Sequence, residues 1–302
     1  MGIADLYNPS EPVISFEFFP PKTDAGYRSL YRTIEELKQL SPGFVSVTMG
    51  AGGSTRAKTV DLTIEITREL GLLSMAHLPC TGFRPDDVGE ILDRLEAGGV
   101  HDVLALRGDP PADDPDFLPP ADGFTYANEL VAYIVARDAQ DRTATAGQGG
   151  ERRRFSIGAA CCPEVHPQAP DAATDLLNLK RKVDAGAHFL ISQLFLDNTR
   201  FFDFVDRARD VGIEIPIVPG VMPIATVAGI RRMAGMNGTV FPEELEEELQ
   251  RVDGDDDATY ALGVRWARRQ CEELLARGVP GIHFYTLNRS PAAREIYESL
   301  FR

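Results

Sequence analysis

Short apolar segments alternate with amphipathic helical segments along the whole chain, and this alternation constrains the fold more than any other feature. We expect strands at 13–19, 44–49, 73–80, 102–108, 155–161, 189–195, 215–221 and 281–287. Strands separated by helices are typical of parallel sheets, because a parallel connection needs a crossover. Eight such units in 302 residues predict one α/β domain, a (β/α)₈ TIM barrel over 1–302. The alternative, a doubly wound open sheet, usually has a G-x-G-x-x-G turn after its first strand, where this chain has Pro20 and Pro21.

The charge of the chain limits its partners. The formal net charge is -15 at pH 7, the opposite of the basic footprint of nucleic-acid-binding proteins, and it disfavours anionic membranes. The sequence has no apolar run that could span a bilayer, and residues 1–12 lack the basic start and apolar core of a signal peptide. We therefore expect a cytoplasmic protein that binds neither nucleic acid nor membrane.

The cysteines predict no metal site. Cys80, Cys161, Cys162 and Cys271 show no C-x-x-C spacing. We expect them to be reduced, buried thiols.

Two polar stretches stand apart from the alternation. Residues 139–154 are polar and rich in Gly and Ala, and we expect a mobile loop there, on the face opposite the active site. Residues 242–260 form an acidic insert before the last strand, which we interpret as a solvated helix and turn.

Glu17 is a carboxylate in a strand that is apolar on both faces. Side chains alternate between the faces of a strand, so Glu17 shares a face with Ser15, whereas Phe16 and Phe18 share the other. A charge placed there is costly unless it is paired or neutralised. Two interpretations stay open: a partnered structural carboxylate, or an acid whose proton affinity is raised for chemistry.

Other polar residues fall at the ends of the expected strands. With Glu17, they are Thr48, His77, Arg107, Asp109, Gln193, Tyr285 and Arg289. Each alone has an ordinary structural interpretation; His77, for example, can be a satisfied core histidine. Chemistry in a TIM barrel gathers at the C-terminal ends of the strands. Because packing alone would not concentrate polar groups there, together they predict an active site.

The helix after the fifth expected strand has two stripes. Leu176, Leu179 and Val183 make an apolar stripe. Its polar stripe, at helical spacing, is Asp175, Asn178, Arg181 and Lys182. The polar stripe is either a solvated face or a surface for the phosphates and sugars of a large cofactor.

Several motifs resemble those of one family. They are SFEFFPPK, FVSVT-GAGGSTR, ALRGDPP, PEVHP, DLLNLKRKVDAGA, ISQLF, PGVMPI and HFYTLNRS, in the family's order from the first strand to just after the last. Together they resemble the motifs of methylenetetrahydrofolate reductase, whose fold is the (β/α)₈ barrel.

The resemblance implies an activity. Members of the family reduce 5,10-methylenetetrahydrofolate to 5-methyltetrahydrofolate, which supplies methyl groups for methionine synthesis. A reduced nicotinamide, which we expect to be NADH rather than NADPH, passes hydride to FAD, and the folate then takes it from the flavin.

The resemblance also implies roles for residues of this chain. Glu17 matches the general acid that opens the five-membered ring, and among aromatic rings we expect its proton affinity to be raised. Asp109 matches a catalytic aspartate between flavin and pterin. Gln193, Tyr285 and Arg289 are expected to contact the substrate. The expected cofactor contacts are Thr48, Met49, Ala51, His77, Arg107, Gly108, Asp109, Tyr126, Ala127, Cys162, His166, Asp175, Asn178, Arg181 and Lys182.

The sequence departs from the family at the flavin. Met49 and Cys162 stand where the family has tyrosines, and Pro79 replaces a threonine. Two lost aromatic hydroxyls weaken a flavin site, so we expect FAD to bind less tightly than usual or to be absent, with direct hydride transfer from the nicotinamide as the alternative.

Two rival functions are weaker. A barrel lyase would need a Schiff-base lysine or a metal cluster at the strand ends, and none is visible in the sequence. A non-catalytic pterin- or flavin-binding barrel would not need both Glu17 and Asp109.

Larger relatives carry a C-terminal domain that binds adenosylmethionine, and we expect no inhibition by adenosylmethionine here. The sequence leaves the oligomeric state open.

Overall fold

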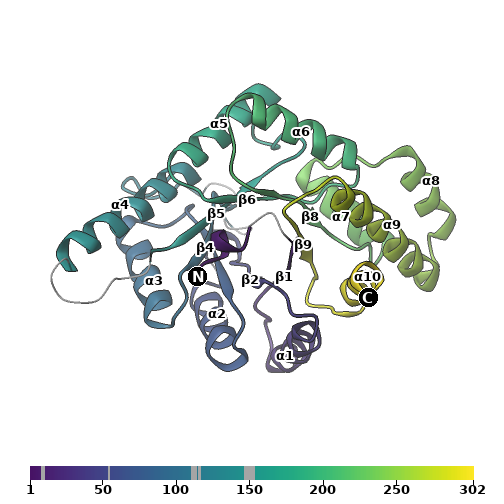
Figure 1. Ribbon diagram of the computed structural model, residues 1–302, viewed down its shortest axis with the longest axis horizontal. Helices are drawn as coiled ribbons and strands as arrows, with labels where there is room; N and C mark the ends of the chain where they lie inside the picture. Colours follow the sequence, from purple (N-terminus) through teal and green to yellow (C-terminus); the bar gives the residue numbers. More distant parts are fainter. Residues whose placement is uncertain (8–10, 54, 110–113, 115–116, 146–153) are drawn as a thin grey trace.

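The fold is a barrel of parallel strands surrounded by helices (Figure 1). We analysed a computed structural model that describes residues 1–7, 11–53, 55–109, 114, 117–145 and 154–302. The strands are β1 Val13–Phe18, β2 Phe44–Val47, β3 Ser74–Pro79, β4 Asp102–Leu106, β5 Ser156–Cys161, β6 Phe189–Ser192, β7 Ile217–Val218, β8 Gly220–Val221 and β9 Gly281–Tyr285. Their order in the sheet is β7-β6-β5-β4-β3-β2-β1-β9-β8, and the paired neighbours run parallel. The predicted TIM barrel is therefore confirmed.

The helices lie outside the strands, as the amphipathic segments predicted (Figure 1). The α-helices of the described residues are α1 Asp24–Lys38, α2 Arg56–Leu70, α3 Pro85–Ala97, α4 Ala127–Thr145, α5 Ala172–Asp184, α6 Asn198–Asp210, α7 Val227–Asn237, α8 Glu243–Val252, α9 Asp256–Ala276 and α10 Pro291–Phe301. Two short 3₁₀ helices are η1 Ile3–Leu6 and η2 Ala51–Gly53.

The barrel closes through an interrupted strand. The single strand predicted at 215–221 is two short ones, because Pro219 lacks the N–H that a continuous ladder needs. β7 pairs with β6, β8 pairs with β9, and the His283 N–H donates to Pro219 O over 2.9 Å. The ring is therefore joined on both sides of the proline.

Side chains fill the interior of the barrel below the strand ends. The interior cluster includes Phe44, Met75, Leu104, Phe189 and Val218. At the N-terminal end η1 adds Ile3, whose N–H donates to Asp102 Oδ1 over 2.7 Å. Outward-facing strand residues instead pack under the helices in a second, larger core, which contains Phe16 and Phe18.

Several strands end earlier than predicted. β2, β4 and β6 end at Val47, Leu106 and Ser192, two or three residues before their predicted ends. The polar residues placed at those ends, such as Thr48 and Arg107, therefore begin the loops that follow. Loops on a rigid barrel are where binding side chains are commonly presented.

Of the two polar stretches, the first differs from the sequence-based expectation and the second forms the expected helix and turn. The first part of the predicted 139–154 loop is helical, because α4 continues to Thr145; residues 146–153 lie outside the described residues. The acidic insert forms α8 and the start of α9. Leu245 and Leu249 of α8 are buried, and Glu246 pairs with Arg231 of α7. The insert is therefore a helix packed on its neighbours, with an acidic outer face.

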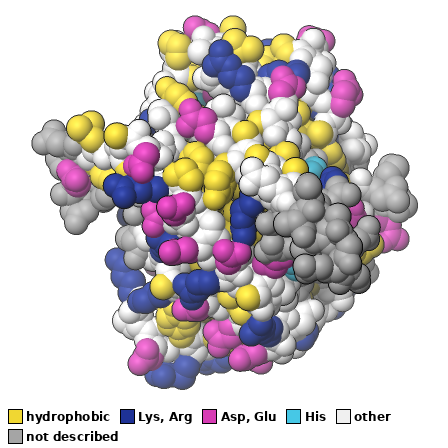
Figure 2. Space-filling view, turned by 90° about the vertical axis from the view of Figure 1, so that its left-hand side faces the viewer, with side chains coloured by type: hydrophobic (Ala, Val, Ile, Leu, Met, Phe, Trp, Pro, Cys, Tyr) yellow, Lys and Arg dark blue, Asp and Glu magenta, His cyan; other side chains and the backbone are white. Residues whose placement is uncertain are grey.

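The surface carries charges of both signs. Figure 2 shows Lys and Arg side chains interspersed with Asp and Glu on the face in view, without one continuous basic area. Within the described ranges, no helix combines the length and the apolar character that crossing a membrane requires.

Candidate active site

One cavity of about 770 Å³ lies at the C-terminal ends of the strands. It collects the large majority of the residues that the sequence predicted for the site. These are Glu17, Thr48, His77, Arg107, Gly108, Asp109, Tyr126, Ala127, Cys162, His166, Asp175, Asn178, Arg181, Lys182, Gln193 and Tyr285. A cavity of this size, lined by apolar side chains and a few convergent polar groups, is typical of a small-molecule or cofactor site.

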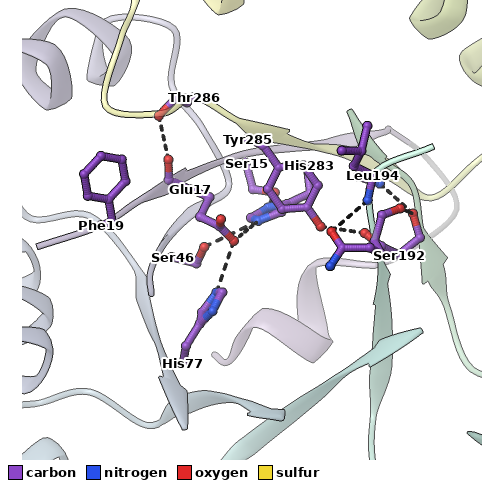
Figure 3. Close-up of polar contacts among 12 residues, drawn as sticks. Ser15, Glu17, Phe19, Ser46, His77, Ser192, Leu194, His283, Tyr285 and Thr286 are labelled. Carbon is purple, nitrogen blue, oxygen red and sulfur yellow. Dashed lines mark hydrogen bonds and ion pairs between the residues drawn. The ribbon is translucent and has the colours of Figure 1, made fainter. Parts of the chain in front are cut away.

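Glu17 lies in the wall of this cavity and contacts two histidines. Its Oε2 is 3.3 Å from His77 Nε2 of β3 and 3.5 Å from His283 Nε2 of β9. Figure 3 shows the two imidazoles reaching the carboxylate from different strands. The His77 contact has ion-pair distance but not the angle of a hydrogen bond. Only 18% of the Glu17 side chain is exposed, so these contacts dominate its surroundings.

The two histidines overturn the expected direction of the Glu17 pKa. Burial raises the pKa of Glu17, but the imidazoles of His77 and His283 outweigh burial and lower it to about 2. The expectation of a raised proton affinity among aromatic rings is therefore wrong. The reason is the alternation of the strand: Phe16 and Phe18 point outward into the helix-covered core, and the carboxylate meets imidazoles instead.

The backbone around Glu17 is tied to the loop after β9. Thr286 Oγ1 donates to Glu17 O over 2.6 Å. The Asn288 side-chain amide accepts from Phe19 N over 2.9 Å and donates to Phe19 O over 2.8 Å. These contacts, drawn in part in Figure 3, fix the end of β1 and with it the position of the carboxylate.

Three polar residues beneath Glu17 were missed by the sequence analysis. His283 Nδ1 lies 2.8 Å from Ser15 Oγ, and His283 Nε2 lies 3.4 Å from Ser46 Oγ. All three residues are fully buried. A signal was present, because each lies two residues before a predicted site residue and therefore on the same face of its strand.

Tyr285 and Gln193 lie on the next part of the wall. The Tyr285 hydroxyl donates to Ser192 O over 2.6 Å, and burial raises the Tyr285 pKa well above its usual value. The hydroxyl proton is thus already used within the protein. Gln193 Oε1 accepts from Leu194 N over 3.0 Å, which leaves the amide NH₂ of Gln193 to donate into the cavity.

Gly220 makes room for Tyr285. A Cβ at this position would lie 2.6 Å from the tyrosine ring and 2.4 Å from Ser192 O. Neither contact can relax easily, because the hydroxyl of Tyr285 is bonded to that same carbonyl. The glycine therefore fixes where the ring of Tyr285 lies.

The cavity lining also includes cationic side chains. Its basic lining residues are Arg107, Arg181, Lys182 and Arg207. Lys182 Nζ donates to Ala160 O over 2.5 Å, and Arg181 Nη1 donates to Asn178 Oδ1 over 2.8 Å. In a chain of net charge -15, these four basic groups offer partners for anions such as phosphates, and Asp109, Glu164 and Asp175 line the same cavity.

The chain is similar to known proteins across nearly its whole length. A sequence model described as methylenetetrahydrofolate reductase matches residues 3–301. The chain is 35% identical over 289 residues to 5,10-methylenetetrahydrofolate reductase of Escherichia coli, covering 95% of this chain and 90% of that protein. The chain belongs to the methylenetetrahydrofolate reductase family.

A plant relative in the family is longer. Methylenetetrahydrofolate reductase (NADH) 1 of Arabidopsis thaliana is 36% identical over 307 residues, which cover 99% of this chain and 50% of that protein. The chain therefore spans about half the length of this relative.

Solved structures share the fold at low sequence identity. An uncharacterized protein from Clostridium thermocellum that binds two copies of 5-methyl-5,6,7,8-tetrahydrofolic acid has a TM-score of 0.58 and 14% identity, and the match covers 98% of this chain and 95% of that one. Oxaloacetate acetylhydrolase has a TM-score of 0.51 and 13% identity, with 99% of this chain and 85% of that one covered.

Three residues expected from the family resemblance do not line the cavity. Met49 is half-buried and packs against the helix-covered core, Ala51 is exposed on η2, and Arg289 is exposed after β9. Cys162, the other residue that stands where the family has a tyrosine, does line it. Burial raises the pKa of the Cys162 thiol to about 12, so this side chain is a neutral thiol.

The described part of the chain contains no group of three or more His, Cys, Asp or Glu side chains arranged to bind a metal ion.

Proposed function

We propose that this protein reduces 5,10-methylenetetrahydrofolate to 5-methyltetrahydrofolate with a reduced nicotinamide as the electron source. The observation that carries the proposal is the placing of Glu17, in contact with two imidazoles, in the same cavity as Arg107, Arg181, Lys182 and Arg207. Family membership supports the reaction, and the Clostridium thermocellum protein of the same fold binds the corresponding product. The product would supply methyl groups for methionine synthesis.

Glu17 carries a proton to the folate ring nitrogen as the five-membered ring opens. With a pKa of about 2, the carboxyl is ionised near neutral pH, so the proton has to reach it from a neighbour. His77 lines the cavity, and its Nε2 lies 3.3 Å from Glu17 Oε2. An imidazole can hold a proton near neutral pH and pass it on. The carboxylate and His77 therefore act as a pair.

Asp109 and Gln193 orient the substrate. Asp109 is an exposed carboxylate in the cavity wall, so it can accept from the donor edge of a pterin. Its negative charge also favours the cation that forms when the ring opens. The free amide NH₂ of Gln193 donates to a substrate acceptor, whereas Tyr285 offers its ring and the lone pairs of its hydroxyl. The exposed Arg289 is retained as a contact for the outer part of the substrate.

The residues present fit the phosphates and sugars of FAD. Lys182 Nζ has three N–H donors. One donates to Ala160 O, which leaves two for a phosphate. Arg107, Arg181 and Arg207 add positive charge to the same cavity. When bound, FAD would accept hydride from the nicotinamide and pass it to the folate. We propose NADH as the donor, since the Arabidopsis thaliana relative is named for it.

Direct transfer of hydride from the nicotinamide to the folate is the second candidate. The observation in its favour is Cys162, which lines the cavity as a small neutral thiol where the family has a tyrosine. Met49 does not line the cavity, so Cys162 is the tyrosine replacement that affects flavin binding directly. Cys162→Tyr should raise the FAD absorbance per chain, and Met49→Tyr is the matched control that should not. A wild-type protein that keeps one FAD per chain through dialysis would rule out direct transfer as the principal route.

Glu17→Gln tests the proposal itself. Gln keeps the shape of the side chain but cannot carry a proton, so folate reduction should fall on the order of a hundred- to ten-thousand-fold. Oxidation of NADH by an artificial electron acceptor needs no proton on the folate and should persist if flavin is bound. Full folate activity in Glu17→Gln would refute the proposed function.

A further inference from the structure

His283 lies beneath Glu17 and has no part in the cavity wall. Its side chain is 0% exposed, and it is absent from the residues that line the cavity. Its ring stacks on Phe44 with centroids 5.9 Å apart and meets Tyr285 edge-on at 5.4 Å. Because His283 cannot touch a molecule in the cavity, any effect on chemistry has to pass through a neighbour.

The polar contacts of His283 aim its ring at Glu17. Nδ1 lies 2.8 Å from Ser15 Oγ, and on the other side of the ring Nε2 lies 3.4 Å from Ser46 Oγ and 3.5 Å from Glu17 Oε2. A hydrogen bond to one ring nitrogen fixes both the orientation of an imidazole and the atom presented by the other. Ser15 thus holds the ring so that Nε2 faces the carboxylate, as Figure 3 shows.

We propose that His283 is a positioning residue for Glu17, which holds one carboxylate oxygen in place from below the floor of the cavity. The inference rests on the proposed function, in which Glu17 carries the proton to the folate. It assigns a role to three buried polar residues, Ser15, Ser46 and His283, that packing alone does not explain. In an interior otherwise filled with apolar side chains, such groups are costly unless they are mutually satisfied.

The groups that face Glu17 determine how its titration responds. They are His77 from β3, Ser46 from β2, and His283 and Tyr285 from β9. Burial raises the pKa of Glu17, and the two imidazoles lower it. Replacing His283 by a neutral residue therefore leaves burial opposed by His77 alone. The pKa of Glu17 should then rise, by about one pH unit, because one of the two groups that lower it is gone.

The test is the titration of the Glu17 carboxyl, followed by ¹³C NMR in protein labelled at glutamate carboxyl carbons. Glu17→Gln assigns the signal. His283→Gln keeps a donor but removes the imidazole that lowers the Glu17 pKa, so the Glu17 signal should titrate at a pH about one unit higher. His188→Gln is the matched control: His188 is an exposed histidine whose Nδ1 accepts from Ile157 N, and its loss should leave the signal unchanged.

A second variant does not remove the imidazole. Ser15→Ala takes away the partner of Nδ1 and should move the Glu17 titration in the same direction by a smaller amount. Ser74→Ala, another buried strand serine that bonds to Thr63 O, is its control and should have no effect. An unchanged Glu17 titration in His283→Gln, or in Ser15→Ala if the first variant does not fold, overturns the inference.

The pH profile of folate reduction separates the inference from the proposed function. If both hold, the alkaline limb of the activity profile, which reports the proton shared by Glu17 and His77, also moves to higher pH in His283→Gln. If the titration moves and the profile does not, His283 positions Glu17 but Glu17 is not the proton carrier. A purely structural role would lower activity at every pH and move neither.

Discussion

Acidification should remove stability that Glu17 contributes to the fold. The folded pKa of about 2 lies below the ordinary value of 4.5. The contribution is therefore complete above the pKa of the unfolded chain and is lost as the pH falls toward the folded pKa. The difference between the two pKa values corresponds to about 3 kcal/mol at neutral pH. Of this, about 2 kcal/mol should disappear between about pH 6 and pH 3, and the rest below.

The assay is urea unfolding followed by the fluorescence of the only tryptophan in the chain, Trp266. Trp266 is buried, and its Nε1 donates to Leu196 O over 3.3 Å, so its emission should report on unfolding. The free energy of unfolding is measured at each pH for wild type and for Glu17→Gln. Gln does not titrate, so the stability of the variant should fall by about 2 kcal/mol less than that of wild type over this interval.

The comparison uses only the change with pH, because Glu17→Gln also alters packing. Glu243→Gln, on the exposed first turn of α8, is the control and should keep the wild-type pH dependence. If Glu17→Gln lost as much stability between about pH 6 and pH 3 as wild type, the two imidazoles would not depress the pKa of Glu17 and the argument from their contacts would fail.

Three further outcomes follow from particular contacts. Gly220→Ala should lower the free energy of unfolding by about 1–3 kcal/mol, measured in urea, because its Cβ would lie 2.6 Å from the Tyr285 ring; an unchanged midpoint would contradict this. Cys162 should react slowly with iodoacetamide at mildly alkaline pH, because burial raises its pKa to about 12, and mass spectrometry should find it labelled only after unfolding. Asn288 has φ +57° and two bonds to the Phe19 backbone, so Asn288→Ala should destabilise the fold more than Asn288→Gly, which keeps the backbone freedom; equal urea midpoints would show that φ does not matter here.

Alternation of strands and helices was sufficient to predict the barrel, because each strand has to bury both faces and each helix one. It also predicted most of the cavity wall, since strand ends of a parallel barrel meet at one edge. It could not locate the break at Pro219. That break depends on which neighbouring strand each part pairs with, β7 with β6 and β8 with β9. The helical start of the 139–154 stretch was missed because its composition is polar.

The sequence by itself determined the family and the barrel and predicted Glu17 as the carboxylate of the site, because these depend on residue type and on spacing along the chain. Only the tertiary structure decided the charge state of that carboxylate. Glu17, His77 and His283 come from β1, β3 and β9, and they meet because the barrel closes β9 against β1. A pKa depends on distances of a few ångströms between groups that are far apart in sequence. The aromatic neighbours of Glu17 along the chain therefore suggested a raised pKa, whereas its neighbours in space lower it.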